Sequence, residues 1–213
     1  MIHRAIEERI HNALAKKKAV TIMGPRQVGK STLADAILPK DARILEINGD
    51  NTDVQTMFIN VDEAKMKVLI GNKNFLFVDE AQKIENVGNM LKIVAEKFKD
   101  VKIIVTGSSA FKLAEAVNES LTGRKREFRL YPLSFKEMAD ETSTLEESRM
   151  IDHRLIYGYY PEVVTSPGDE KEVLKELIDS YLYKDVMEEN NIAKPDKLVK
   201  LVQALAFQIG STV

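Results

Sequence analysis

The chain has 213 residues, of which 44% are hydrophobic and 30% charged, so it can bury a core in one domain with a small appendage. It contains no cysteine, which excludes disulfides and thiolate metal sites, and its three dispersed histidines offer no metal-ligand spacing. A formal net charge of −2 gives no global drive toward nucleic acid, and no apolar run is long enough to span a membrane. We therefore expect a cytoplasmic protein with no membrane partner.

The first fifteen or so residues predict an amphipathic helix. Ile2, Ile6, Ile10 and Leu14 recur every fourth residue, which places them on one face. Lysines occupy positions 16–18 at the C-terminal end of this segment. They are either contacts for phosphate or nucleic acid, or a solvated helix end, where cations are favourable.

Residues 24–31 read GPRQVGKS and fit the phosphate-binding signature G-x-x-x-x-G-K-[ST]. A strand-like stretch at 19–23 precedes them and a helical stretch at 31–38 follows, which disfavours a chance glycine-rich turn. Gly24 and Gly29 would let backbone N–H groups approach phosphate oxygens. Lys30 would add charge near the β- and γ-phosphates, and Ser31 a hydroxyl for Mg²⁺. The expected nucleotide-binding residues are Gly24, Pro25, Arg26, Gln27, Val28, Gly29, Lys30, Ser31 and Thr32.

Further strand patterns at 43–48, 74–80, 101–105 and 127–131 alternate with helical patterns at 52–72, 87–98 and 111–117. This alternation predicts an α/β fold with a doubly wound, parallel, five-stranded sheet. Beyond Pro132 we expect only helices, near 134–140, 146–158, 170–189 and 196–209, with bends at 158–161 and 194–195. The apolar face of the last helix either folds back on this helical module or awaits a further domain.

Two adjacent carboxylates, Asp79 and Glu80, end the apolar run at 74–80. Beside a P-loop, the first would lie next to the magnesium ion, and the second would act as general base on the attacking water. The alternative is a pair of solvated carboxylates at a strand end.

The strand at 101–105 should lie between the first and third strands, so a polar group at its end could reach the γ-phosphate. Ser108 is the first candidate and Thr106 the second, although this sequence is also typical of a loop start or a helix cap. Arg124, in the basic cluster 123–126, could reach the γ-phosphate of a neighbouring subunit. A solvated basic turn is an equally good interpretation of that cluster.

The base is expected to be adenine. A guanine-recognition element Asn-Lys-x-Asp is missing, since the nearest string, Asn72–Phe75, lacks the aspartate and precedes the wrong strand. The ligands predicted from the sequence are therefore ATP or ADP with Mg²⁺.

The segments GPRQVGKST, FLFVDEAQ, TGSSA, LTGR, YPLSFKE and YGYYPEVV together resemble the AAA-superfamily ATPases of bacteria and archaea that carry a C-terminal domain of unknown function. The resemblance implies an ATPase core over 1–133 with strand order 5-1-4-3-2 and a helical lid over 134–192. It also implies the start of a winged-helix-like domain at 193–213, in a chain that ends before the domain of unknown function. The roles it carries over fall on Lys30, Ser31, Asp79, Glu80, Ser108 and Arg124.

The lid sequence departs from that family in two respects. It offers no evident second sensor arginine, although Arg154 lies near enough to be considered. Tyr159 and Tyr160 replace glycines, and they either stack on adenine or pack in the core.

We expect Mg²⁺-dependent ATP hydrolysis coupled to movement of the lid or of subunits. The alternatives are an ATP-binding switch with negligible hydrolysis and a DNA-associated ATPase.

Overall fold

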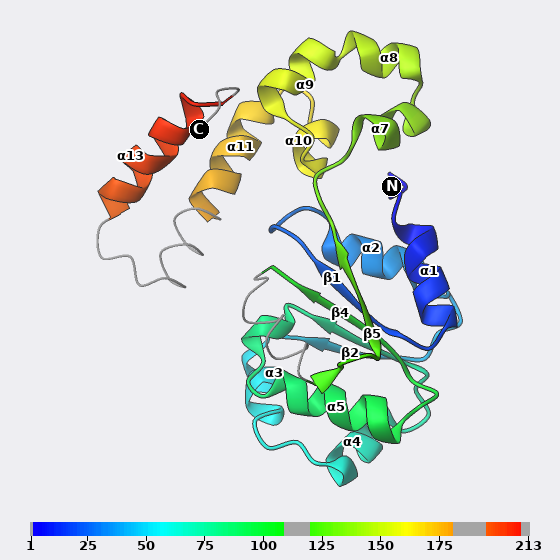
Figure 1. The fold of residues 1–213 in the computed structure, drawn as a ribbon. Helices are drawn as coiled ribbons and strands as arrows, with labels where there is room; N and C mark the ends of the chain where they lie inside the picture. Colours follow the sequence, from blue (N-terminus) through cyan, green and yellow to red (C-terminus); the bar gives the residue numbers. More distant parts are fainter. Residues whose placement is uncertain (1, 109–119, 181–194, 210–213) are drawn as a thin grey trace.

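The computed structural model describes residues 2–108, 120–180 and 195–209. Its centre is a five-stranded sheet in the order β2-β3-β4-β1-β5 (Figure 1). All neighbouring strands are parallel. The predicted order 5-1-4-3-2 is therefore confirmed, with β4 between β1 and β3. The strands are β1 Ala19–Met23, β2 Ile44–Asn48, β3 Phe75–Asp79, β4 Lys102–Gly107 and β5 Lys125–Arg129.

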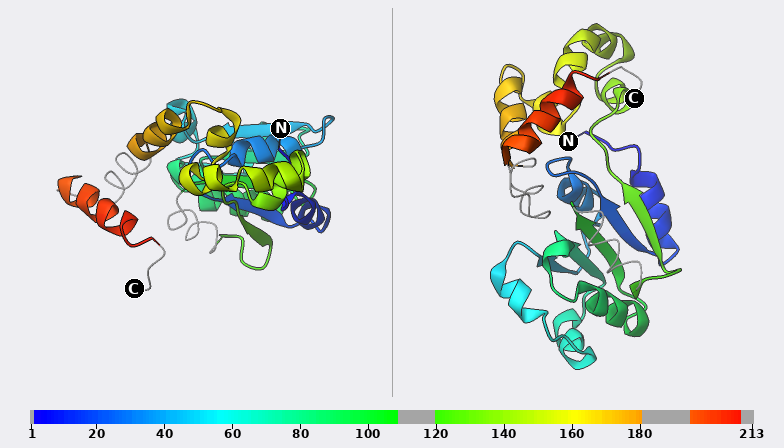
Figure 2. Two further views of the ribbon diagram at one scale, coloured as in Figure 1. Left: turned by 90° about the horizontal axis from the view of Figure 1, so that it is seen from above. Right: turned by 60° about the vertical axis from the view of Figure 1, so that its left-hand side comes forward.

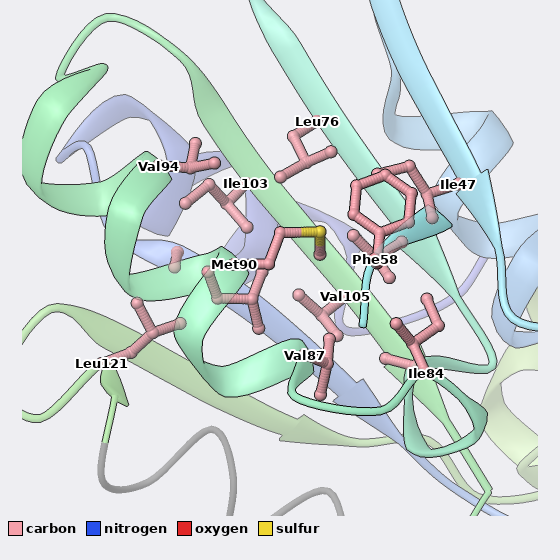
Figure 3. Close-up of a cluster of buried hydrophobic side chains, with 14 of the residues drawn as sticks. Ile47, Phe58, Leu76, Ile84, Val87, Met90, Val94, Ile103, Val105 and Leu121 are labelled. Carbon is pink, nitrogen blue, oxygen red and sulfur yellow. The ribbon is translucent and has the colours of Figure 1, made fainter. Parts of the chain in front are cut away.

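Helices cover both faces of the sheet, because successive strand residues point to opposite sides and both sides are apolar. One face packs against α1 (Glu7–Ala15) and α2 (Lys30–Ile37). The other packs against α3 (Thr52–Met57), α4 (Glu63–Ile70) and α5 (Val87–Lys97). In the second layer, Met90 and Val105 belong to one buried cluster (Figure 3). Helices thus hold the sheet in place on both faces, and a site can form at the ends of its strands.

The helical module that follows comprises α7 (Phe135–Glu141), α8 (Thr144–Arg149), α9 (Ile151–Tyr157), α10 (Pro161–Thr165) and α11 (Glu170–Ile178). It lies beyond the end of the sheet, as the views in Figures 1 and 2 agree. A capping box at Ser134 begins α7. A small apolar cluster of Val163, Val173 and Leu177 joins α10 to α11. The last described helix is α13 (Pro195–Ala206), and no helix in the described ranges is long and apolar enough to cross a membrane.

Several predicted elements differ from those observed. The first helix begins at Glu7, because the preceding residues form a turn and an extended segment. The stretch 52–72 contains two helices, and 146–158 is broken at Met150 into α8 and α9. The expected bend at 158–161 leads directly into α10, with Pro161 at its first position, where the missing N–H costs nothing. The helix expected at 111–117 and the end of that expected at 170–189 lie outside the described residues.

Candidate nucleotide-binding site

The loop between β1 and α2 approaches its neighbours too closely for side chains at its first position. A Cβ on Gly24 would lie 2.3 Å from the carbonyl oxygen of Leu130, and its N–H donates to the Gly107 oxygen over 3.3 Å. Gly29 has φ +92°, a backbone conformation that strains residues with a side chain. The two glycines of the motif therefore serve close packing at Gly24 and backbone conformation at Gly29.

Lys30 is 5% exposed and folds back over the loop. Its Nζ donates to the carbonyl oxygens of Gly24 at 3.1 Å and Pro25 at 2.9 Å. The same atom lies 3.9 Å from Oε1 of Glu80. The loop thus holds a desolvated cation beside the carboxylate that the sequence nominates as the base.

Ser31 and Asp79 meet at the carboxyl edge of the sheet, the edge at which the parallel strands end. The Ser31 hydroxyl donates to Oδ2 of Asp79 over 2.8 Å. Oδ1 of the same carboxylate accepts from the hydroxyl of Thr106, which is completely buried on β4. A hydroxyl and a carboxylate at one point form the hard oxygen donor set that Mg²⁺ prefers, so these residues fit that ion.

Glu80 has a left-handed backbone conformation, φ 47° and ψ 44°, which is uncommon for a non-glycine residue and costs on the order of 1–3 kcal/mol. Its carboxylate is held at Oε2, which accepts from Nε2 of Gln82 and, at 3.3 Å, from the Ser108 hydroxyl. Nε2 of Gln82 also lies 2.9 Å from Oγ of Ser108. Three polar side chains from the ends of β3 and β4 thus form one cluster.

Two cavities adjoin this cluster and the loop. One, of about 540 Å³, is lined by P-loop residues, Glu80 and, from the helical module, Pro161, Glu162 and Thr165. The other, of about 460 Å³, is more apolar, with Ile2, Leu133, Met138 and Val164 among its lining residues. Gly29, Thr32, Pro161 and Thr165 line both. A polar compartment therefore continues into an apolar one, and both have a size typical of ligand sites.

Four candidates from the sequence lie away from this cluster. Arg124 immediately precedes β5, at the opposite edge of the sheet, where its Nη1 lies 3.3 Å from Oε1 of Glu96.

Arg154 is buried within the helical module and donates to both carboxylate oxygens of Glu147, at 3.0 and 3.4 Å. Tyr159 lies under that guanidinium, 5.5 Å from its centre. Tyr160 packs on the apolar cluster of α10 and α11. The lid arginine and both tyrosines therefore have contacts within the module.

Sequence reasoning missed three side chains at the site. Gln82 carries a recognisable signal, since it follows Glu80 by two residues. Arg4 donates to the Val28 carbonyl of the P-loop, and Glu137 on α7 is its partner. Neither was foreseen, because their pairing spans 133 residues of sequence.

The fold and the loop define a P-loop protein with a parallel sheet of the ATPase type. More particularly, the profile of a family described as "AAA domain" matches residues 16–139, more than half of the chain, and the chain belongs to that family. A second profile, for a domain of unknown function, matches residues 148–213. The expectation that the chain ends before such a domain is therefore wrong. Helices α9, α10 and α11 of the expected lid, and α13 of the expected further domain, fall within it.

An uncharacterized protein of Methanocaldococcus jannaschii, MJ1544, is 28% identical over 206 residues, 89% of this chain and 46% of the relative. The chain spans less than half the length of the curated relatives it matches.

Among solved structures, the Walker-type ATPase PABY2304 of Pyrococcus abyssi superposes with a TM-score of 0.63 at 18% identity, over 92% of this chain and 77% of that one. The Orc1 protein of Aeropyrum pernix, solved with DNA, superposes with a TM-score of 0.51 at 13% identity, over 96% and 66%. At these identities the likeness shows the fold alone. Family and fold together support nucleotide binding of the ATPase type.

Proposed function

We propose that the chain binds ATP with Mg²⁺ and hydrolyses it. The observation that carries this proposal is the convergence of Lys30, the Ser31–Asp79 hydrogen bond and Glu80 around one cavity. A cation, a magnesium-compatible oxygen pair and a second carboxylate are the groups that phosphoryl transfer to water requires.

In this proposal the loop N–H groups and Lys30 hold the phosphates, while the apolar cavity beside Ile2 and Met138 takes the adenosine. Ser31 and Asp79 would hold Mg²⁺, which neutralises phosphate charge when bound. Glu80 would accept a proton from the attacking water, and Gln82 and Ser108 fix the carboxylate that does so. Because residues of the helical module line both cavities, the module would act as a lid whose position depends on whether nucleotide is bound.

The test uses calorimetric ATP binding and phosphate release with the complete chain in excess Mg²⁺. We expect Lys30→Ala to lose binding, and Glu80→Gln to bind ATP but lose turnover. Lys73→Ala, at an exposed residue after α4, is the matched lysine control and should behave as wild type. Wild-type protein that binds no ATP would contradict the proposal, and full turnover by Glu80→Gln would remove Glu80 as the base. ATP binding without turnover in the wild type would favour a nucleotide switch.

Arg124 lies at the opposite edge of the sheet and cannot serve the P-loop of its own chain. We propose that it acts on the nucleotide of a second copy in a homo-oligomer. Mixing two inactive variants, Lys30→Ala and Arg124→Ala, should then restore part of the turnover, because an intact site forms between unlike copies. A mixture as inactive as its components, alongside an active wild type, would reject this role.

Nucleic-acid binding is a second candidate function, favoured by a cavity of about 150 Å³ at that opposite edge. Six basic side chains line it, against one carboxylate, that of Asp100. They are Lys16, Lys17, Lys18, Lys99, Lys102 and Arg124. We expect Lys16→Glu with Lys99→Glu to weaken salt-sensitive duplex binding, and equal binding by wild type and variant would reject the cavity as the contact.

A further inference from the structure

Arg4 lies in the extended segment before α1 and is 7% exposed. Its guanidinium contacts three separate parts of the chain. Nη1 donates to the carbonyl oxygen of Val28 in the P-loop over 3.1 Å, and Nη2 to that of Tyr131 after β5 over 2.6 Å. Nε donates to Oε1 of Glu137 on α7 over 3.1 Å. One buried cation therefore joins the loop, the sheet and the helical module.

Glu137 is equally restrained. Oε1 also accepts from the backbone N–H of Ala5 at 2.8 Å, and Oε2 accepts from the backbone N–H and the hydroxyl of Ser134. Burial raises the pKa of this carboxyl, but the N–H groups of Ala5 and Ser134 and the Arg4 guanidinium outweigh burial and lower it overall. The carboxylate of Glu137 is therefore ionised and balances the charge of Arg4. The effect of Arg4 on the loop then comes from the directions of its hydrogen bonds more than from its net charge.

The contact with Val28 orients the P-loop. A trans peptide is planar, so the Val28 carbonyl and the Gly29 N–H, which share one peptide unit, point in opposite directions. A guanidinium on that oxygen fixes the peptide with its N–H directed away from Arg4. It also polarises the peptide, which strengthens that N–H as a donor. Gly29 leaves this peptide otherwise loosely restrained, since glycine accepts several conformations.

We propose that Arg4 is a positioning residue for the phosphates of the nucleotide: it orients the Val28–Gly29 peptide and, through Glu137, ties that orientation to the first helix of the module. This inference rests on the proposed nucleotide binding. It assigns a function to a residue outside the P-loop motif, in a segment that forms neither strand nor helix.

The experiment compares ATP, which has the phosphates, with adenosine, which lacks them, by calorimetry in excess Mg²⁺. Arg4→Lys keeps the charge beside Glu137, but its single nitrogen cannot reach the three separate acceptors that Nε, Nη1 and Nη2 of the arginine reach. We expect it to weaken ATP binding by about tenfold, as for one lost charge-assisted hydrogen bond. Arg4 also lines the apolar cavity, where lysine keeps an aliphatic stem, so adenosine binding should weaken by less than about twofold. Glu137→Gln should weaken ATP in the same direction, because it releases the guanidinium from its anchor.

Two controls separate positioning from stability. Arg9→Lys makes the same substitution at an exposed arginine of α1 and should bind ATP as wild type does. Ser143→Ala removes a capping hydroxyl from α8, the next helix of the module, without touching Arg4 or Glu137, and thermal unfolding measures its loss of stability.

Wild-type ATP affinity in Arg4→Lys, or in a folded Glu137→Gln if Arg4→Lys does not fold, overturns the inference. So does an equal loss for ATP and adenosine, or a Ser143→Ala variant that reproduces the Arg4→Lys loss. A wild-type protein that binds neither ligand contradicts nucleotide binding itself and is thereby distinguished from these outcomes.

Discussion

Replacing Thr106 by valine tests whether β4 positions Asp79, the carboxylate that we propose binds Mg²⁺. The hydroxyl of Thr106 donates to Oδ1 of Asp79 and lies 3.4 Å from the backbone nitrogen of Glu80. Valine keeps the shape and the β-branching but removes both contacts. A hydrogen bond to a charged acceptor contributes about 1.5–3 kcal/mol, so we expect a loss of stability in that range. Asp79 would also lose one of its two hydrogen-bond donors, Thr106, and keep the other, Ser31. If about 1.4 kcal/mol of the lost hydrogen-bond energy acts in the transition state, turnover falls about tenfold.

Thr21 provides a matched control on the adjacent strand β1. It too is completely buried, but within the described part of the chain its hydroxyl has no hydrogen-bond partner. Removing an unpaired buried hydroxyl leaves stability unchanged or raises it by about 1 kcal/mol. Thr21→Val should therefore separate the effect of the substitution from the effect of the contact.

The assays are urea denaturation without nucleotide and steady-state ATP turnover in excess Mg²⁺. Thr106→Val should lower both the midpoint of unfolding and kcat, whereas Thr21→Val should lower neither. Equal results for the two valine variants would refute the assignment of Thr106 as the residue that holds Asp79.

Three further substitutions probe the backbone, the charge and the packing. Gly24→Ala should destabilise the chain and abolish ATP binding, because its Cβ would meet the Leu130 oxygen at 2.3 Å; thermal unfolding and calorimetry measure this, and wild-type values would contradict it. The pKa of Glu137 is lowered below its ordinary 4.5, so its stabilisation is present above that pH and is lost as pH falls through the lowered value. Glu137→Gln should flatten this acid-side loss in denaturation curves, and an unchanged pH dependence would contradict it. Arg154→Met leaves Glu147 buried without its partner and should cost about 3–5 kcal/mol of unfolding free energy, whereas a cost below about 1 kcal/mol would show the pair to be dispensable.

The sheet could be predicted because its determinants are local. Each strand is a short apolar run between turn residues, and parallel strands bring their carboxyl ends to one edge. The P-loop, Asp79 and Glu80 follow those ends directly, so their proximity follows from strand order. Ser108 meets Glu80 for the same reason.

The contacts of the helical module could not be predicted, because they depend on pairings remote in sequence. Arg154 looks like a free sensor until α8 brings Glu147 to it, and Arg4 looks like a surface residue until α7 brings Glu137. The spacing of apolar residues identifies the buried face of a helix, but it does not identify which charged side chain elsewhere in the chain will pair with a charged residue of that helix. The short helix α10 was missed because Pro161 both ends a pattern and begins one.

The strained and crowded backbone positions of the site have one structural origin. A Cβ on Gly24 would collide with the chain leaving β5, and a Cβ on Gly49 would lie 2.4 Å from the backbone carbonyl oxygen of Glu80. Glu80 itself has a left-handed backbone conformation. Each arises where the chain leaving one strand passes the end of its neighbour. The two apolar layers hold those strands in place, so the strain persists where the phosphates would bind. If the proposed nucleotide binding moves any part of the chain, we expect the movement in the helical module, which Arg4 joins to the P-loop.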